Sequence, residues 1–381
     1  MIRLEEYKAG HTEKGVGGYG YFVPSFINGE WKWDNPMINR LLEDAAIKLG
    51  ELNSFAKLVP NIDLFIHLHV TKEAVKSSRI EGTQTNIDEA LLGESEILPE
   101  RRNDWKEVNN YIRALNYAIG RLEKLPISSR LIRETHAILL DSVRGEHKQP
   151  GEFRTSQNWI GGTSPADAVF VPPHHQYVEG LMGDLENFLH NDDIVVPKLI
   201  RIGIAHYQFE TIHPFLDGNG RIGRLLIPLF LVDGNILDKP LLYLSSYLER
   251  NKELYYDNLT FVRTKNDMTQ WLKYFLVGIG ETASNAAKTL SQIIQLKSDT
   301  ENLINERFGR KSNSAILLLQ YLLKQPVIFV ADAKQATGLS YKAANNLVAD
   351  FEKSGILKEM TGQSRNRFFV FDQYLGLFRQ D

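Results

Sequence analysis

The sequence predicts a mainly α-helical fold with a β-hairpin insertion and a C-terminal winged helix. Three observations support this fold class. Apolar residues recur at helical spacing on both sides of residues 213–220. Two short β-prone runs, 157–162 and 168–173, flank a turn rich in Gly, Thr, Ser and Pro, which indicates a hairpin. Near the C-terminus, a helix-turn-helix pattern precedes two alternating runs, as in a winged helix.

Along the chain we expect three domains. Residues 1–104 form an N-terminal helical segment that includes a helix over 34–58. Residues 105–298 form a helical domain that is interrupted by the hairpin, and residues 311–381 form the winged-helix-like domain. The elements expected in this last domain are the helix 312–324, the β-prone run 327–330, the helix pair 331–337 and 340–353, and the wing strands 356–360 and 367–371.

Composition restricts the class of protein. The chain has 381 residues, of which 43% are hydrophobic, enough to bury a substantial core. The absence of cysteine excludes disulfides, thiolate metal sites and a cysteine nucleophile. No apolar run approaches about 18 residues and residues 1–6 lack the apolar core of a signal peptide, so we expect a cytoplasmic protein without membrane association. The glycine-rich residues 15–20 follow no strand and open no helix, so we expect a mobile arm there.

The most informative stretch is residues 213–224, His-Pro-Phe-Leu-Asp-Gly-Asn-Gly-Arg-Ile-Gly-Arg. Pro214 disfavours helical backbone at His213, so the helix predicted over 198–212 ends there. Helical periodicity resumes at Arg221. The Gly-Asn-Gly turn therefore lies at the N-terminus of a second helix, where backbone N–H groups and the helix dipole favour an anion.

The chemistry of these residues suggests a role for each. His213 can accept a proton near neutral pH and is the candidate general base. Asp217 is the one carboxylate of the stretch and suits Mg²⁺ or Mn²⁺, which prefer oxygen ligands. Arg221 and Arg224 share one helix face and can each bind phosphate oxygens. Each residue alone also fits a structural role, but the combination at this spacing favours a site that cuts a polyphosphate.

This stretch resembles the signature of the Fic family, His-x-Phe-x-(Asp/Glu)-Gly-Asn-Gly-Arg-x-x-Arg, and matches it at every specified position. The resemblance implies transfer of AMP from ATP to a hydroxyl group of a target protein, although other nucleotidyl donors fit the same loop. It also implies that His213 deprotonates the target hydroxyl, that Asp217 binds Mg²⁺ and that Phe215 is a packing residue.

The resemblance further implies a set of ATP-binding residues. The expected set is Gly218, Asn219, Gly220, Arg221, Ile222, Gly223, Arg224, Asn251 and Tyr256. The turn at 218–220 would cradle the α- and β-phosphates, while Arg221 would hold the β-phosphate and Arg224 the γ-phosphate. Asn251 and Tyr256 belong to a later stretch that resembles the region near the nucleotide base, although adjacent tyrosines also fit a half-buried core.

A second stretch, residues 77–82, resembles the inhibitory pattern of the family, (Ser/Thr)-x-x-x-Glu-(Gly/Asn). Ser77 and Glu81 are four residues apart and so lie on one face of the predicted helix, and Gly82 suits the end of that helix. The resemblance implies that Glu81 pairs with Arg224 and keeps the γ-phosphate from lying productively. Taken by itself, the pattern also fits a solvated glutamate. Its place before the main motif resembles the subclass with an N-terminal inhibitory helix.

The predicted hairpin resembles the Fic flap. An exposed strand edge near the phosphate site would bind and align a segment of the target protein through main-chain hydrogen bonds. Without the neighbouring motif, an ordinary surface hairpin would be the preferred interpretation.

The sequence of the C-terminal domain does not decide whether its partner is DNA or a protein. Residues 311–381 contain nine Lys/Arg and six Asp/Glu, a net charge of +3 against −6 for the remainder, which is small for a surface that follows DNA phosphates. The residues placed for DNA contact are Lys342, Asn345, Asn346, Arg365 and Arg367. Winged helices also serve as dimerisation or protein-docking modules.

Two classes of function follow from the sequence. The first is a protein adenylyltransferase, autoinhibited by Glu81, that modifies Ser, Thr or Tyr of a target protein or of itself, with the winged helix for docking or homodimer formation. The second is a DNA-binding regulator whose Fic domain is vestigial; the intact motif counts against it. Within the first class, Glu81 could instead orient a water molecule that removes AMP from a target.

Overall fold

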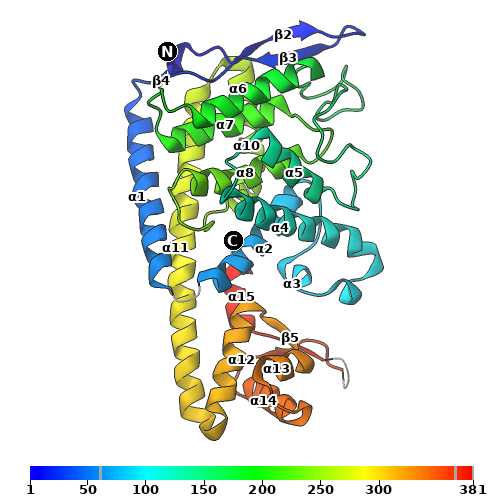
Figure 1. Cartoon of the computed structure of the whole chain (residues 1–381), viewed down its shortest axis with the longest axis vertical. Coiled ribbons are helices and arrows are strands. Elements are labelled where there is room, and N and C mark those ends of the chain that lie inside the picture. The colour runs from blue at the N-terminus through cyan, green and yellow to red at the C-terminus, as the bar shows by residue number, and fades with distance from the viewer. Residues whose placement is uncertain (60–61, 364–366, 380–381) are drawn as a thin grey trace.

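The computed structural model describes residues 1–59, 62–363 and 367–379. Helices build most of the molecule, which confirms the predicted mainly α-helical class. The long helix α11 (Met268–Arg307) runs along the longest axis of the molecule (Figure 1). Most other helices gather around its upper part, and the C-terminal elements lie at its lower end (Figure 1). Within the described ranges, no helix combines the length and apolarity needed to cross a bilayer.

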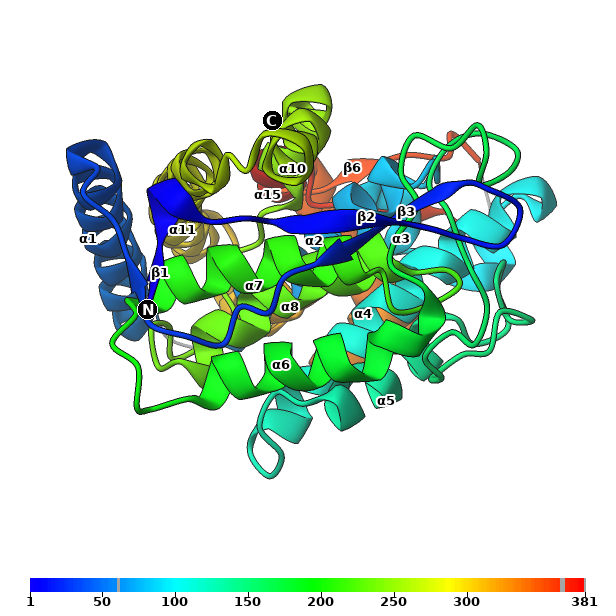
Figure 2. The same ribbon diagram turned by 90° about the horizontal axis from the view of Figure 1, so that it is seen from above.

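The N-terminal segment lies over the top of the helices. β1 (Ile2–Arg3) pairs in parallel with β4 (Trp31–Lys32), and β2 (Gly10–Lys14) pairs antiparallel with β3 (Gly20–Pro24). Figure 2 shows β3 crossing close to α7. Two glycines between β2 and β3 have positive φ (94° and 85°), which glycine adopts without strain. The arm expected at 15–20 is thus the turn of a hairpin together with the first residue of β3.

Two long helices lead into the central bundle. α1 (Pro36–Leu58) lies along α11 (Figure 1). Asn35 caps α1, because its side-chain oxygen accepts a hydrogen bond from the backbone N of Met37 at 3.1 Å. α2 (Ile62–Ile80) follows and packs against α4 and α9. Its C-terminal end carries the predicted inhibitory residues into the bundle.

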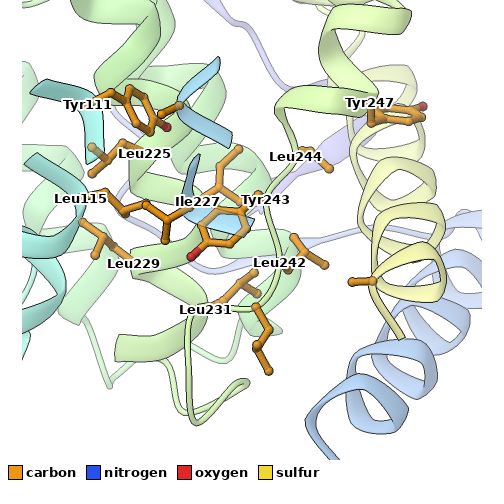
Figure 3. Close-up of a cluster of buried hydrophobic side chains, with 14 of the residues drawn as sticks. Tyr111, Leu115, Leu225, Ile227, Leu229, Leu231, Leu242, Tyr243, Leu244 and Tyr247 are labelled. Carbon is orange, nitrogen blue, oxygen red and sulfur yellow. The ribbon is translucent and has the colours of Figure 1, made fainter. Parts of the chain in front are cut away.

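The central bundle is built around α8. Its helices are α3 (Ile87–Ala90), α4 (Arg102–Leu122), α5 (Ser129–Leu139), α6 (Val178–His190), α7 (Lys198–Ile212), α8 (Asn219–Asp233), α9 (Ser245–Arg250) and α10 (Lys252–Lys265). Short 3₁₀ turns lie at Leu4–Glu6, Glu94–Glu96, Pro99–Arg101, His175–Tyr177 and Gly309–Lys311. Leu225 and Leu229 of α8 pack in one buried cluster with Leu115 of α4 and with Leu242 and Tyr243 from the segment before α9 (Figure 3). A helix that is apolar on all sides needs neighbours on all sides, so α8 is fixed firmly in place.

The C-terminal elements follow α11. They are α12 (Ser312–Lys324), β5 (Val327–Phe329), α13 (Val330–Thr337), α14 (Tyr341–Lys353), β6 (Lys358–Glu359), β7 (Phe368–Val370) and α15 (Asp372–Arg379). The strands lie in the order β5-β7-β6 and are antiparallel. Gly338 ends α13 with φ of 70° and provides the turn before α14. Of the residues placed for DNA contact, Arg365 lies outside the described residues.

The C-terminal elements contact α2 directly. The ring of Phe378 in α15 lies edge-on to His69 of α2, with 5.1 Å between centroids. Nη2 of Arg379 in α15 lies 2.6 Å from Oδ1 of Asp88 in α3. The predicted domain boundaries at 104 and 298 fall inside α4 and α11 respectively, and the division of the chain into domains stays a prediction.

Candidate active site

The sequence motif forms the loop between α7 and α8. His213 ends α7 in the left-handed conformation (φ 50°), and its backbone N donates to the carbonyl of Phe209 at 3.0 Å. Gly218 precedes α8 with φ of 77°, a conformation that favours glycine. The first turn of α8 begins at Asn219, so its unpaired backbone N–H groups face the loop as the sequence predicted.

Side-chain hydrogen bonds fix the shape of this loop. The Asn219 amide accepts from the backbone N of Phe215 and donates to its carbonyl, both at 2.8 Å. The His136 ring of α5 stacks on the Phe215 ring with 3.7 Å between centroids. Nε2 of His136 lies 2.9 Å from the Asp217 carbonyl, and Nδ1 accepts from the backbone N of Gly151. Sequence reasoning missed His136, because a helical histidine 81 residues away carries no local signal.

The segment before the flap holds the backbone at His213. Nε of Arg154 donates to the His213 carbonyl at 2.9 Å, and Nδ2 of Asn158 donates to the Phe215 carbonyl at 2.8 Å. Arg154 is buried, with 2% of its surface exposed, and further donates to the carbonyls of Pro173 and Ile212. Asn158 lies in the first β-prone run of the predicted hairpin and Arg154 lies just before it, but their role in shaping the catalytic loop could not be predicted from the sequence.

The imidazole of His213 is held neutral. Burial lowers its pKa to about 4, and the positive charge of Arg154 acts in the same direction. Within the described part of the chain, Nδ1 of His213 has no hydrogen-bond partner. A ring that stays neutral above that pKa is in the protonation state that a general base requires before it takes a proton from the target.

Asp217 fits the role of a metal ligand. Its Oδ1 accepts from the backbone N of Gly218 at 2.5 Å and lies 3.3 Å from Nη2 of Arg221. The side chain is 34% exposed, so it can be reached by an ion from solvent. Mg²⁺ is commonly held by one or two carboxylates together with substrate phosphates, and this donor set suits it.

The two motif arginines each pair with a carboxylate from another helix. Nη1 of Arg221 lies 3.1 Å from Oε2 of Glu107 in α4, and both side chains are 2% exposed. Burial raises the pKa of Glu107, although Arg221 and Arg144 oppose that shift. Glu107 was not identified from the sequence, because it lies 114 residues before its partner.

Arg224 is bound by the residues predicted as inhibitory. Its Nη2 donates to Oε1 of Glu81 at 2.6 Å and to the Ser77 carbonyl at 3.0 Å, and its Nε donates to the Ser77 hydroxyl at 2.9 Å. Burial would raise the pKa of Glu81, but the charge of Arg224 outweighs it and lowers the pKa. A side chain on Gly220 would lie 2.5 Å from Oε1 of Glu81. The Glu81 carboxylate thus stands over the first turn of α8.

A buried network anchors α2 in this position. Glu73, one turn before Ser77, accepts hydrogen bonds from the hydroxyls of Tyr111 (2.9 Å) and Ser245 (2.6 Å). These partners come from α4 and α9. At the other end, Nζ of Lys252 donates to the Ile80 carbonyl at 2.7 Å. The predicted inhibitory helix is therefore tied to three neighbouring helices.

The flap is a loop closed by a single antiparallel bridge rather than a pair of extended strands. Ile160 N donates to the Phe170 carbonyl at 2.8 Å, and Val169 N donates to the Ile160 carbonyl at 2.9 Å. The N-terminal hairpin supports it, because Phe22 N of β3 donates to the Val171 carbonyl at 3.0 Å. The guanidinium of Arg263 lies 3.8 Å from the Phe170 ring.

The remaining predicted residues lie in different surroundings. The Ile222 side chain is fully buried in the core, and Gly223 faces Glu210 of α7. Tyr256 is 41% exposed. Burial of part of its side chain and the negative charge of Glu81 together raise the pKa of Tyr256 to about 12, so Tyr256 lies near Glu81. Asn251 joins α9 to α10, donates to the Tyr247 carbonyl and lines a groove with Lys48 and Glu281.

The fold and the loop define a Fic-type site, and comparison with known proteins agrees. The profile of the Fic/DOC family N-terminal region matches residues 39–120, and the profile of the Fic/DOC family matches residues 126–231. The chain belongs to the Fic/DOC family.

Curated relatives match part of the chain. It is 28% identical to the protein adenylyltransferase fic-1 of Caenorhabditis elegans over 160 residues, which cover 40% of this chain and 30% of the relative. It is also 28% identical to a probable protein adenylyltransferase of Aquifex aeolicus over 188 residues, which cover 46% and 52%. The chain thus spans about half or less of these relatives.

Solved structures share the fold. A Fic family protein from Desulfovibrio desulfuricans aligns with a TM-score of 0.54 at 20% identity, over 88% of this chain and 96% of that one. A Fic domain containing signaling protein from Bacteroides thetaiotaomicron aligns with a TM-score of 0.52 at 19% identity, over 67% and 97%.

Proposed function

We propose that the chain is a protein adenylyltransferase that transfers AMP from ATP to a Ser, Thr or Tyr hydroxyl of a target protein. One observation carries the proposal: the neutral His213 and the carboxylate of Asp217 flank the N-terminus of α8 in a loop that is fixed from several sides. The curated relatives named as protein adenylyltransferases support it.

The proposed step uses groups that are already in place. The target oxygen forms a bond to the α-phosphorus while the bond from that phosphorus to the β-phosphate oxygen breaks. The target proton passes to His213, and pyrophosphate leaves with the electron pair. The N–H groups at the start of α8 and the guanidinium of Arg221 would stabilise the phosphate charge. Mg²⁺ or Mn²⁺ on Asp217 would neutralise the polyphosphate.

We further propose that Glu81 inhibits this reaction. Its carboxylate binds the guanidinium that the γ-phosphate would use, and it lies over the helix N-terminus that would attract an anion. The reverse reaction, in which Glu81 orients a water molecule that removes AMP, is the second candidate. Its support is that Glu81 is 33% exposed and therefore accessible to water.

The C-terminal elements fit a winged helix that docks a protein or forms a homodimer. The order helix, strand, helix, turn, helix, strand, strand supports this assignment. DNA binding remains the alternative class, with Lys342 and Asn346 exposed on α14. Electrophoretic mobility shift with random-sequence duplex DNA at 50 and 200 mM salt would separate the two, because binding to phosphates weakens steeply with salt.

The test of the transfer reaction uses the position of a label. The Glu81→Gly variant, with Mg²⁺, is incubated with ATP labelled at either the α- or the γ-phosphate, and protein-bound label is followed. Retention of the α-label alone, on the chain itself or on an added protein, supports AMP transfer. Retention of the γ-label shows phosphorylation, and absence of both labels contradicts the proposal. Release of label from a modified target by the unaltered chain would support the reverse reaction.

A further inference from the structure

An arginine outside the motif reaches the phosphate end of the site. Arg144 follows α5, and its Nε lies 3.4 Å from Oε1 of Glu107 while its Nη2 lies 3.5 Å from Oε2. The same Oε2 lies 3.1 Å from Nη1 of Arg221. One buried carboxylate therefore holds two guanidiniums, of which Arg221 is 2% exposed and Arg144 is 62% exposed.

The backbone beside Arg144 touches the predicted metal ligand. Gly145 has φ of 97°, and a side chain added there would lie 2.7 Å from Oδ2 of Asp217. Asp217 in turn lies 3.3 Å from Arg221. The loop that carries Arg144 is thus fixed at the side of the site formed by Asp217 and Arg221, where the proposed function places the β-phosphate.

Charge explains why the exposed arginine matters here. An isolated surface ion pair contributes little, and a single buried carboxylate needs only one guanidinium to be paired. Glu107 has two, and Arg221 is held by Asp217 as well, so the exposed Arg144 is the guanidinium of this group that can meet an anion from solvent. A guanidinium that is more than half exposed can turn from the carboxylate toward a phosphate without leaving a buried charge unpaired, because Arg221 remains on Glu107.

We propose that Arg144 binds the β- and γ-phosphates of the donor and the pyrophosphate that departs, and that Glu107 is a positioning residue that holds Arg144 beside Arg221. The inference rests on the proposed function. It predicts the chemical class of ligand that this position selects, which is a nucleoside di- or triphosphate in preference to a monophosphate. Arginine suits the task because its planar fork matches two phosphate oxygens.

Nucleotide affinity tests the proposal without relying on transfer activity. The Glu81→Gly chain is the parent, and its affinities for ATP, ADP and AMP with Mg²⁺ are measured by calorimetry. Arg144→Ala should weaken ATP and ADP binding about tenfold, the scale of one charge-assisted hydrogen bond, and leave AMP binding unchanged. Arg113→Ala is the matched control, because Arg113 is similarly exposed (58%) and pairs with Asp141. It should change none of the three affinities.

A double variant separates phosphate contact from neutralisation of Glu107. If Arg144 contacts the phosphates, Arg144→Ala still weakens ATP binding when Glu107 is replaced by Gln. If Arg144 only balances the charge of Glu107, it has no effect in that background, and the proposal is overturned. Equal losses for ATP, ADP and AMP, or no loss at all while the parent binds ATP, also overturn it. If the Glu81→Gly parent binds no nucleotide, that result contradicts both the proposed function and this inference.

Discussion

The carboxylate of Glu81 lies 2.6 Å from Nη2 of Arg224 and stands over Gly220, in the first turn of α8. The contact joins residues that are 143 positions apart in the sequence. It places a negative charge where the helix N-terminus attracts anions, and it occupies a guanidinium of the motif. Arg224 is 1% exposed and is also bound by Ser77, so its guanidinium is held in this position from more than one side.

Loss of the His213 imidazole should stop transfer without preventing ATP binding. We expect His213→Asn to reduce transfer by ~10²-fold or more, the scale of a positioned base. Asn is preferred to Ala here, because it tolerates the left-handed backbone at this position (φ 50°). Single-turnover transfer and calorimetric ATP binding are measured in parallel. Near-normal transfer by the folded variant would mean that another group is the base.

Metal dependence should follow the charge of Asp217. Asp217→Asn keeps the shape of the side chain but removes the charge that attracts Mg²⁺. We expect transfer at low Mg²⁺ to fall at least about tenfold and to recover in part as Mg²⁺ is raised, because the affinity for the ion has dropped. The titration is read as transfer rate against Mg²⁺ concentration. A curve that coincides with that of the unaltered side chain would argue against Asp217 as the ligand.

The flap should support target modification through its backbone. Val169→Pro removes one of the N–H groups that donate to the Ile160 carbonyl, next to the bridge between Ile160 and Phe170, so it weakens the closure of the flap. We expect modification of a separate target protein to fall while ATP affinity stays unchanged. Val169→Thr is the control, because it keeps the N–H and alters only a side chain that is 82% exposed. A parallel loss of ATP affinity in the proline variant would show that the catalytic loop itself was disturbed.

Glu210 should make stability depend on pH. This carboxyl lies in α7 with Oε1 lacking a partner in the described part of the chain, and burial raises its pKa from 4.5 to about 8. The folded state then binds more protons than the unfolded state between these values, so this group's contribution to stability is lost as the pH rises through the window. Glu210→Gln cannot ionise and should avoid that loss.

Denaturant unfolding of both proteins measures the effect. The free energy of unfolding of Glu210→Gln should match the parent near pH 4.5 and exceed it by a few kcal/mol near pH 8, since each pKa unit corresponds to about 1.4 kcal/mol. A constant difference between the two proteins across this range would show that Glu210 does not titrate as its burial implies.

Short-range signals in the sequence were sufficient to predict the two helices that flank the motif and the loop between them. A proline after His213 and glycines before Arg221 act on their own neighbours, so the end of α7 and the start of α8 follow from short-range chemistry. The pairing of Glu81 with Arg224 was expected from the family resemblance, and the structure has this contact together with one from Ser77.

The supporting contacts could not be predicted in the same way. Glu107, His136 and Glu73 lie on helices whose periodicity indicates a buried face but not which residue of another helix they meet. The hairpin at 10–24 was not predicted. Its strands alternate only weakly between buried and exposed residues, with Tyr21 and Val23 facing inward, and the glycines between them indicated a loop. Such contacts depend on how helices pack, which short-range patterns do not specify.

The central claim is that Glu81 restrains a competent transferase. The most direct measurement is incorporation of α-labelled AMP by Glu81→Gly, compared with the unaltered chain and with Glu81→Gly combined with His213→Asn. Loss of one charge-assisted pair of ~1.5–3 kcal/mol predicts a rise of roughly tenfold to over a hundredfold for the single variant and no incorporation for the double variant. Incorporation by Glu81→Gly that is no higher than that of the unaltered chain would contradict the account.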